Sequence, residues 1–167
     1  GSYTGGLISA AGEDVTLIDP WPDHISKIVQ EGLQITTANG VQLVYPKAIH
    51  INEIHALIKT PIDVAFICTK SYDTGWAATL VKDYLSTDGI AVSLQNGINE
   101  ECIANILGWG RTLGCIANAL TVTIPTPGHV VRTSKVERND YIVYRAGEVH
   151  GRITPRLNDV VDLLDKA

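Results

Sequence analysis

The chain has 167 residues, of which 45% are hydrophobic and 19% are charged. This length suits one domain with a continuous core, and the composition is too apolar for a disordered chain. The formal net charge of −5 argues against a nucleic-acid partner, and no apolar run is long enough to cross a bilayer.

The first third of the sequence predicts helices and short strands in alternation. Pro22 suits the first turn of a helix, and Asn39-Gly40 is a strong signal for a hairpin turn between two apolar runs. Gly12 is a candidate for the glycine that follows a helix. We expect helices at residues 1–11, 22–31 and 51–58, and strands at 15–18, 33–37 and 41–45.

The remainder continues the alternation. We expect strands at 64–68, 90–94, 113–117 and 120–124, helices at 74–85, 100–107 and 155–164, and antiparallel ribbons at 129–132 and 141–145. Strands that alternate with helices predict βαβ units with right-handed crossovers. The predicted fold class is therefore α/β: a Rossmann-like, doubly wound, mostly parallel sheet with an antiparallel ribbon near the C-terminus. In it, the strands at 15–18, 64–68 and 90–94 should lie side by side or one strand apart.

Polar residues follow three of the apolar strands. They are Asp19, Thr69-Lys70 and Gln95-Asn96. In an open parallel sheet, ligands bind outside the carboxyl ends of the strands. Each of these residues alone fits an ordinary solvated loop, but the three together indicate a ligand site.

Asp19 has two interpretations. A carboxylate after the second strand of a dinucleotide fold accepts the adenosine ribose hydroxyls and repels a 2′-phosphate, which favours NAD over NADP. The spacing fits if Gly1 is the last glycine of a GxGxxG motif whose earlier part, with the first strand, lies outside the chain. The alternative, an Asp that shapes a turn with Pro20, fits this residue equally well.

Lys70 and Asn96 also have structural alternatives. The Lys70 ammonium emerges one residue after a buried strand, where it can meet a phosphate, a ribose or a carboxylate. Without context, a lysine that simply reaches water is the better interpretation. Asn96-Gly97 opens the next helix, and the Asn96 amide can donate and accept hydrogen bonds or serve as a helix cap.

The other conspicuous residues predict structure rather than chemistry. His50 and His55 do not form an HExxH motif, so no metal site is expected. Ser93 lies outside a GxSxG motif, which argues against a hydrolase. We expect the scattered tryptophans to be packing or interface residues, and the cysteines, which form no CxxC pair, to be buried thiols of a cytoplasmic protein: Trp21, Trp76 and Trp109; Cys68, Cys102 and Cys115.

Three segments, GSYTGGLISAAGEDVTLID, DVAFICTKSYDT and VSLQNGINEE, closely resemble the ketopantoate reductase family of 2-dehydropantoate 2-reductases and their relatives. The segments GCIANALTVTIPTPGHV and VYRAGEVHGRITPR extend the resemblance over essentially the whole chain, and the most specific parts are CTK and QNG. The resemblance implies an enzyme of pantothenate biosynthesis that reduces a 2-keto acid, such as 2-dehydropantoate, with hydride from NAD(P)H.

The resemblance also implies roles for individual residues. Gly1 would lie beside the cofactor pyrophosphate, and Lys70 and Asn96 would lie near both cofactor and substrate. The expected cofactor-binding residues are Gly1, Asp19, Thr69, Lys70, Gln95, Asn96 and Gly97.

Two departures from the family pattern matter. The family usually uses NADPH and often has a basic residue where this chain has Asp19. Its catalytic lysine and partner carboxylate belong to a C-terminal helical domain, so we expect residues 1–167 to form one cofactor-binding domain without catalytic residues. A homodimer is possible on this interpretation. The alternatives are an S-adenosylmethionine-dependent methyltransferase, which leaves Lys70 and QNG unexplained, and a non-catalytic nucleotide sensor.

Overall fold

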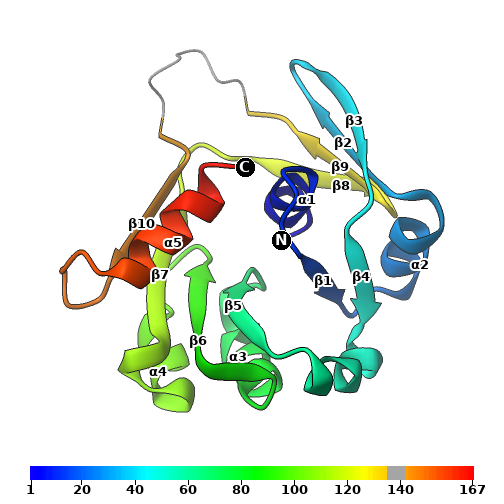
Figure 1. The fold of residues 1–167 in the computed structure, drawn as a ribbon. Helices are drawn as coiled ribbons and strands as arrows, with labels where there is room; N and C mark the ends of the chain where they lie inside the picture. The colour runs from blue at the N-terminus through cyan, green and yellow to red at the C-terminus, as the bar shows by residue number, and fades with distance from the viewer. Residues whose placement is uncertain (135–141) are drawn as a thin grey trace. The chain divides into compact units, whose positions relative to one another are not determined.

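The computed structural model describes residues 1–134 and 142–167. The chain divides into two compact units. The first comprises residues 1–55, 119–143 and 163–167, and the second comprises 56–118 and 144–162. Both are built from helices and strands, as the sequence predicts (Figure 1). The expected single domain over 1–167 stays a prediction.

The first unit contains two sheets and two helices. Strand β1 (Thr16–Asp19) pairs in parallel with β4 (Lys47–His50). A second sheet has the order β3-β2-β9-β8, in which β2 and β9 are parallel and the other pairs are antiparallel. Its strands are β2 (Leu33–Thr37), β3 (Gly40–Val44), β8 (Val122–Thr126) and β9 (His129–Arg132).

Helices α1 (Ser2–Ala10) and α2 (Pro22–Glu31) supply the helical side of the core of this unit. Pro22 occupies the first turn of α2, where its missing N–H costs nothing. The helix ends at Gly32, whose φ of 88° is strained for other residues, and whose added Cβ would lie 2.9 Å from the Val44 carbonyl oxygen. The core consists of Tyr3, Ile28, Leu33, Ile35, Val44 and Val130.

The second unit is built on a four-stranded sheet with the order β10-β7-β6-β5. Strands β5, β6 and β7 are parallel, and β10 is antiparallel to β7. The strands are β5 (Ile62–Ile67), β6 (Leu85–Leu94), β7 (Thr112–Ala117) and β10 (Tyr144–Glu148). Helices α3 (Thr74–Lys82) and α4 (Glu100–Leu107) pack on this sheet over a core of Ile67, Ala77, Ala78, Ala91 and Ile103.

Short helical elements complete the chain. The 3₁₀ helices are η1 (Ile51–Lys59), η2 (Ser71–Asp73) and η3 (Trp109–Arg111), and the last helix is α5 (Pro155–Leu164). The helix expected at residues 51–58 therefore forms as a 3₁₀ helix.

The predicted α/β class and the antiparallel strand near the C-terminus are confirmed. Strands β5 and β6 are adjacent and parallel, as expected. Strand β1 pairs with β4 in a sheet of its own, so its expected place beside β5 and β6, or one strand apart from them, stays a prediction. Within residues 1–134 and 142–167, no strand pairs with the other edge of β1.

Two further expectations need correction. Helix α3 ends at Lys82 rather than at residue 85, because Leu85 already pairs with Ile62 in the sheet. The last ribbon begins at Tyr144, and Tyr141 lies outside the described residues.

The three cysteines are free thiols in different environments. Cys115 is buried, Cys68 is partly buried, and Cys102 is exposed, so the expectation of three buried thiols is wrong for Cys102. Burial raises the pKa of the Cys115 thiol to about 12.

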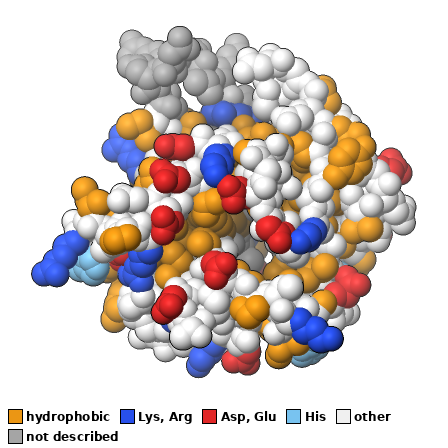
Figure 2. All heavy atoms as spheres, in the orientation of Figure 1, with side chains coloured by type: hydrophobic (Ala, Val, Ile, Leu, Met, Phe, Trp, Pro, Cys, Tyr) orange, Lys and Arg blue, Asp and Glu red, His pale blue; other side chains and the backbone are white. Residues whose placement is uncertain are grey.

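The surface carries charges of both signs. Acidic and basic side chains are interspersed on the face drawn in Figure 2. None of the helices in the described part of the chain is long and apolar enough to span a membrane.

Candidate functional site

Two loops lie side by side in the second unit. Thr69–Ser71 follows β5, and Gln95–Gly97 follows β6. Because β5 and β6 are parallel, with Ile67 paired to Ser93, the two loops leave the same edge of the sheet. The predicted neighbourhood of Lys70 and Asn96 is therefore present.

The buried side chain of Gln95 connects the two loops. Its side chain is buried, and its Nε2 donates to the carbonyl oxygen of Thr69 at 2.8 Å and to Thr74 Oγ1 at 2.9 Å. Its Oε1 accepts a hydrogen bond from Ser93 Oγ at 3.3 Å. The Gln95 amide is thus occupied by protein groups, and its role in the structure is to hold the loops together.

A second set of hydrogen bonds, to the carbonyl oxygen of Asn96, also connects the two loops. Ser71 Oγ donates to the carbonyl oxygen of Asn96 at 2.7 Å, and Asn99 Nδ2 donates to the same oxygen at 3.0 Å. Gly97 between them has a φ of 95°, and an added Cβ would lie 3.4 Å from Ser71 Oγ. The tight turn therefore favours glycine at this position.

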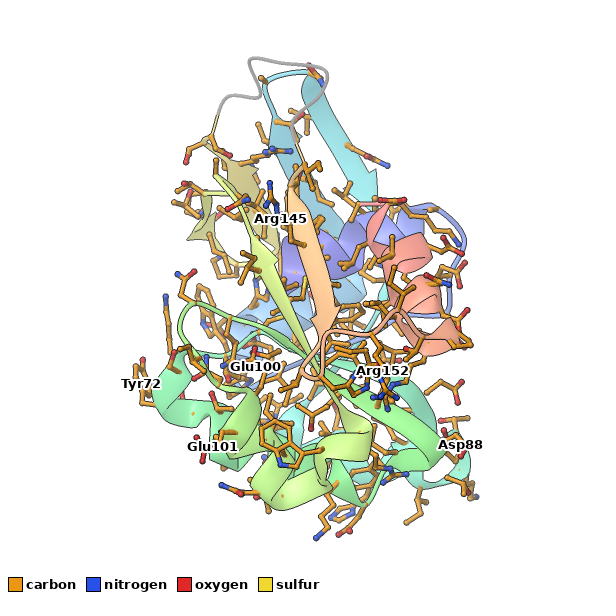
Figure 3. The ribbon with its side chains drawn as sticks, turned by 90° about the vertical axis from the view of Figure 1, so that its left-hand side faces the viewer. Tyr72, Asp88, Glu100, Glu101, Arg145 and Arg152 are labelled. Carbon is orange, nitrogen blue, oxygen red and sulfur yellow. The ribbon has the colours of Figure 1, made fainter. Side chains whose placement is uncertain are left out.

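The side chains of Lys70 and Asn96 are left for other partners. Both residues are exposed, and neither side chain has a hydrogen bond or ion pair to the residues that the structure describes. Tyr72 projects outward from η2 beside them and is 84% exposed (Figure 3). An ammonium and an amide on a fixed backbone can bind an anion and a carbonyl or hydroxyl group.

The start of α1 in the first unit has the properties of an anion site. Gly1 provides no side-chain cap, and the N–H groups of a first helical turn have no carbonyl partner within the helix. The N–H of Gly128 donates to His24 Nδ1 at 3.0 Å, so the ring proton lies on Nε2, which is 3.0 Å from Ser2 Oγ. Nε2 therefore donates to Ser2, whose own hydroxyl hydrogen points elsewhere.

His24 is kept neutral in this position. It is fully buried, and burial lowers the pKa of the imidazole more than the nearby Asp19 carboxylate raises it. A neutral ring suits both of its hydrogen bonds, because a protonated ring could not accept from the Gly128 N–H.

Asp19 divides its two oxygens between two roles. Oδ1 accepts the backbone N–H of Trp21 at 2.8 Å, so the carboxylate does shape the turn. Oδ2 has no hydrogen-bond partner in the described part of the chain. The turn interpretation is therefore correct for one oxygen, and the other is available to a ligand.

The predicted site residues are divided between the two units. Lys70 and Asn96 lie on adjacent loops of the second unit, whereas Gly1 and Asp19 belong to the first. That Asp19, Lys70 and Asn96 share one edge of the sheet stays a prediction. No cluster of three or more potential metal ligands occurs within the described ranges.

Several residues that support the two candidate regions were not predicted as site residues from the sequence. Ser71 and Asn99 gave a weak signal, since each lies within three residues of a predicted one. His24 gave another, as a histidine among the apolar positions of α2. The residues that the structure adds are Ser2, Trp21, His24, Ser71, Thr74 and Asn99.

Parallel strands, crossover helices and polar loops at the strand ends define the class of Rossmann-like α/β proteins. Solved structures support this class. A 2-dehydropantoate 2-reductase from Porphyromonas gingivalis W83 matches 99% of this chain and 57% of its own, with a TM-score of 0.81 and 18% identity. A D-mandelate dehydrogenase solved with NADH and anilino(oxo)acetate matches 99% of this chain and 50% of its own, with a TM-score of 0.77 and 19% identity.

The particular family follows from the sequence. Residues 1–142 match the model of the ketopantoate reductase PanE/ApbA family, and the chain belongs to that family. The 2-dehydropantoate 2-reductase of Pyrococcus horikoshii is 37% identical over 117 residues, which cover 70% of this chain and 36% of the relative. The chain thus spans about a third of this curated relative and about half of the solved chains.

Proposed function

We propose that this chain is the cofactor-binding part of an oxidoreductase that reduces a 2-keto acid, such as 2-dehydropantoate, with NAD(P)H. The proposal places the enzyme in the cytoplasm and in pantothenate biosynthesis. The observation that carries it is the pair of closed loops after β5 and β6, which present Lys70 and Asn96 on the CTK and QNG segments. The membership of the chain in the ketopantoate reductase family supports it.

The donor set fits a dinucleotide. The first turn of α1 and the Ser2 hydroxyl are suited to a pyrophosphate, and Asp19 Oδ2 is suited to a ribose hydroxyl. When bound, a nicotinamide cofactor would supply the hydride.

The second unit supplies the groups for the substrate end. The Lys70 ammonium attracts the carboxylate of a keto acid or a cofactor phosphate. The Asn96 amide donates to a carbonyl oxygen and holds it in place. Gln95, Ser71 and Asn99 fix the backbone from which these side chains extend. On this proposal the proton donor lies outside residues 1–167.

The first experiment measures cofactor binding and turnover by the protein that carries this chain. We expect saturable binding of NADH or NADPH, followed by oxidation of the cofactor when 2-dehydropantoate is added. Lys70→Ala should raise the KM for the keto acid, whereas Lys82→Ala, at the end of α3, should not. Absence of binding by both cofactors would refute the proposal.

Asp19 gives a prediction about cofactor choice. Two like charges about 4 Å apart repel by roughly 4 kcal/mol at an effective dielectric constant of about 20, and salt and rearrangement reduce this value. A residual of about 1.4 kcal/mol still changes binding tenfold. We expect NADH to bind more tightly than NADPH, and Asp19→Asn to narrow the difference. Tighter binding of NADPH by the unaltered protein would show that Asp19 serves the turn alone.

Two other classes were open from the sequence. A methyltransferase would bind S-adenosylmethionine, and a nucleotide sensor would bind a nucleotide without turnover. The family match favours neither class, and the same titrations distinguish both from a reductase.

A further inference from the structure

The loop that joins β1 to α2 (Figure 1) carries an aromatic residue, Trp21. Trp21 is 40% exposed, although it follows a half-buried carboxylate by only two residues. Its ring lies against His24, with the ring centroids 5.5 Å apart and an angle of 14° between the planes. One side of the indole is therefore covered by a stacked ring, while a large part of the side chain stays open to a ligand.

Three hydrogen bonds fix the backbone of this loop at Pro20 and Trp21. Asp19 Oδ1 accepts the Trp21 N–H at 2.8 Å, and His50 Nε2 donates to the Pro20 carbonyl oxygen at 2.9 Å. The Trp21 carbonyl oxygen accepts the N–H of Ile25 at 3.2 Å, which starts α2. The indole is therefore attached to a chain segment that has little freedom to move.

The ring beneath Trp21 is fixed as well. His24 is fully buried, and both of its nitrogens are engaged, with Gly128 on one side and Ser2 on the other. An imidazole held at both nitrogens cannot tilt without breaking a hydrogen bond. The stack of His24 and Trp21 is thus a rigid base, and little conformational entropy is lost when a further ring is added to it.

We propose that Trp21 is a stacking platform for the adenine of the cofactor, on the side of its ring away from His24. The inference rests on the proposed function and gives a binding role to Trp21, which the sequence predicts to be a packing or interface residue. Adenine is bonded directly to the ribose that Asp19 Oδ2 would bind, so the base lies within reach of a residue two positions further on. An aromatic side chain can stack on any base, because every base has a π-face. Such stacking does not require the adenine to be buried.

The test separates the adenosine half of the cofactor from the nicotinamide half. ADP-ribose, NADH and nicotinamide mononucleotide are titrated by calorimetry into the unaltered protein, Trp21→Leu and Trp21→Phe. We expect Trp21→Leu to weaken ADP-ribose and NADH about tenfold or more, and Trp21→Phe to restore most of the loss. Nicotinamide mononucleotide should bind equally to all three. Trp109→Leu, which changes a tryptophan that is 52% exposed in the other unit, is the matched control.

Fluorescence gives an independent measurement. In a protein with Trp76 and Trp109 both changed to Phe, ADP-ribose should quench the emission of Trp21. Circular dichroism and the thermal midpoint establish that each variant folds. Equal affinity of the unaltered protein and Trp21→Leu for ADP-ribose would overturn the platform and leave the proposed function intact. Failure of the unaltered protein to bind NADH, NADPH or ADP-ribose would overturn both.

Discussion

The two units bury an ionisable side chain in opposite ways. In the first unit His24 is fully buried and neutral, and it is hydrogen-bonded to a backbone N–H and a hydroxyl group. In the second unit the Glu148 side chain is 1% exposed and charged, and Arg156 binds both of its oxygens at 2.6 and 2.7 Å. Thr154 Oγ1 adds a third hydrogen bond at 2.5 Å.

The partners explain the difference. Gly128 N–H can only donate, so the ring beside it must keep a free lone pair. Arg156 carries a full positive charge, and its hydrogen bonds to Glu148 are the main reason that the pKa of the carboxyl falls to about 2. His24 supports the loop of a candidate binding site, whereas Glu148 joins β10 to α5 and, through Arg156 and Gly110, to η3. The charged pair of Glu148 and Arg156 thus connects elements of the fold, whereas the neutral His24 lies beside a candidate ligand site.

The largest effect should come from the charged pair. We expect Glu148→Gln to lower the free energy of unfolding by about 3 kcal/mol, because it leaves Arg156 without its carboxylate in a largely buried setting. Equilibrium denaturation in urea measures this loss. The matched control is Asp14→Asn, which removes an exposed ion pair with Lys47 and should cost less than about 1 kcal/mol.

The same carboxylate predicts a pH window. Its pKa is about 2 in the folded chain against an ordinary value of 4.5. The stabilisation is therefore complete above pH 4.5 and is lost as the pH falls from 4.5 toward 2. Glu148→Gln should flatten this part of the stability curve. An equal dependence in the variant and the unaltered protein would show that other groups cause the loss.

Gln95 tests whether a buried neutral side chain of the second unit contributes as much to the free energy of unfolding as the charged Glu148. This neutral side chain is buried in the same unit as Glu148. We expect Gln95→Leu to cost about 2 kcal/mol, because it removes the hydrogen bonds of the Gln95 amide to the Thr69 carbonyl oxygen and to the buried hydroxyl groups of Thr74 and Ser93. The cost should not vary between pH 5 and 8. A variant as stable as the unaltered protein would show that water replaces the amide.

The smallest effect should come from His24, and it should depend on pH. The pKa of His24 is lowered in the folded chain from an ordinary value of 6.5. Its contribution is thus complete above pH 6.5 and is lost as the pH falls toward the folded pKa, by at most about 1.4 kcal/mol per pH unit. His24→Gln keeps one donor and one acceptor and should remove this dependence. The measurement is the free energy of unfolding of both proteins from pH 5 to 7.5. The same slope against pH in His24→Gln as in the unaltered protein would contradict the prediction.

The sequence predicted elements best where local signals mark their ends. Helix α2 lies between Pro22 and Gly32, and its predicted bounds are correct. The sequence predicts helix α3 three residues too long, to residue 85, because Leu85 continues its apolar pattern. The partner that decides the conformation of Leu85 is Ile62, more than twenty residues earlier, and no local pattern reports it.

The candidate site shows the same limit. Lys70 and Asn96 were found because they follow apolar strands, and this position is visible in one sequence. The buried supports were not found, because their partners come from distant segments. His24 meets Gly128 across 104 positions, and Gln95 meets Thr69 across 26. A residue's own neighbours in sequence cannot reveal such a contact.

The three cysteines differ in exposure, and this difference allows selective chemical labelling. Burial raises the pKa of the Cys115 thiol to about 12, so its thiolate, the form that attacks maleimides, is scarce at neutral pH. Cys102 lies exposed on α4, and Cys68 is only partly accessible. A dye attached briefly at neutral pH should therefore select α4 without any engineered residue. Such a label would report on the helix that follows the QNG loop.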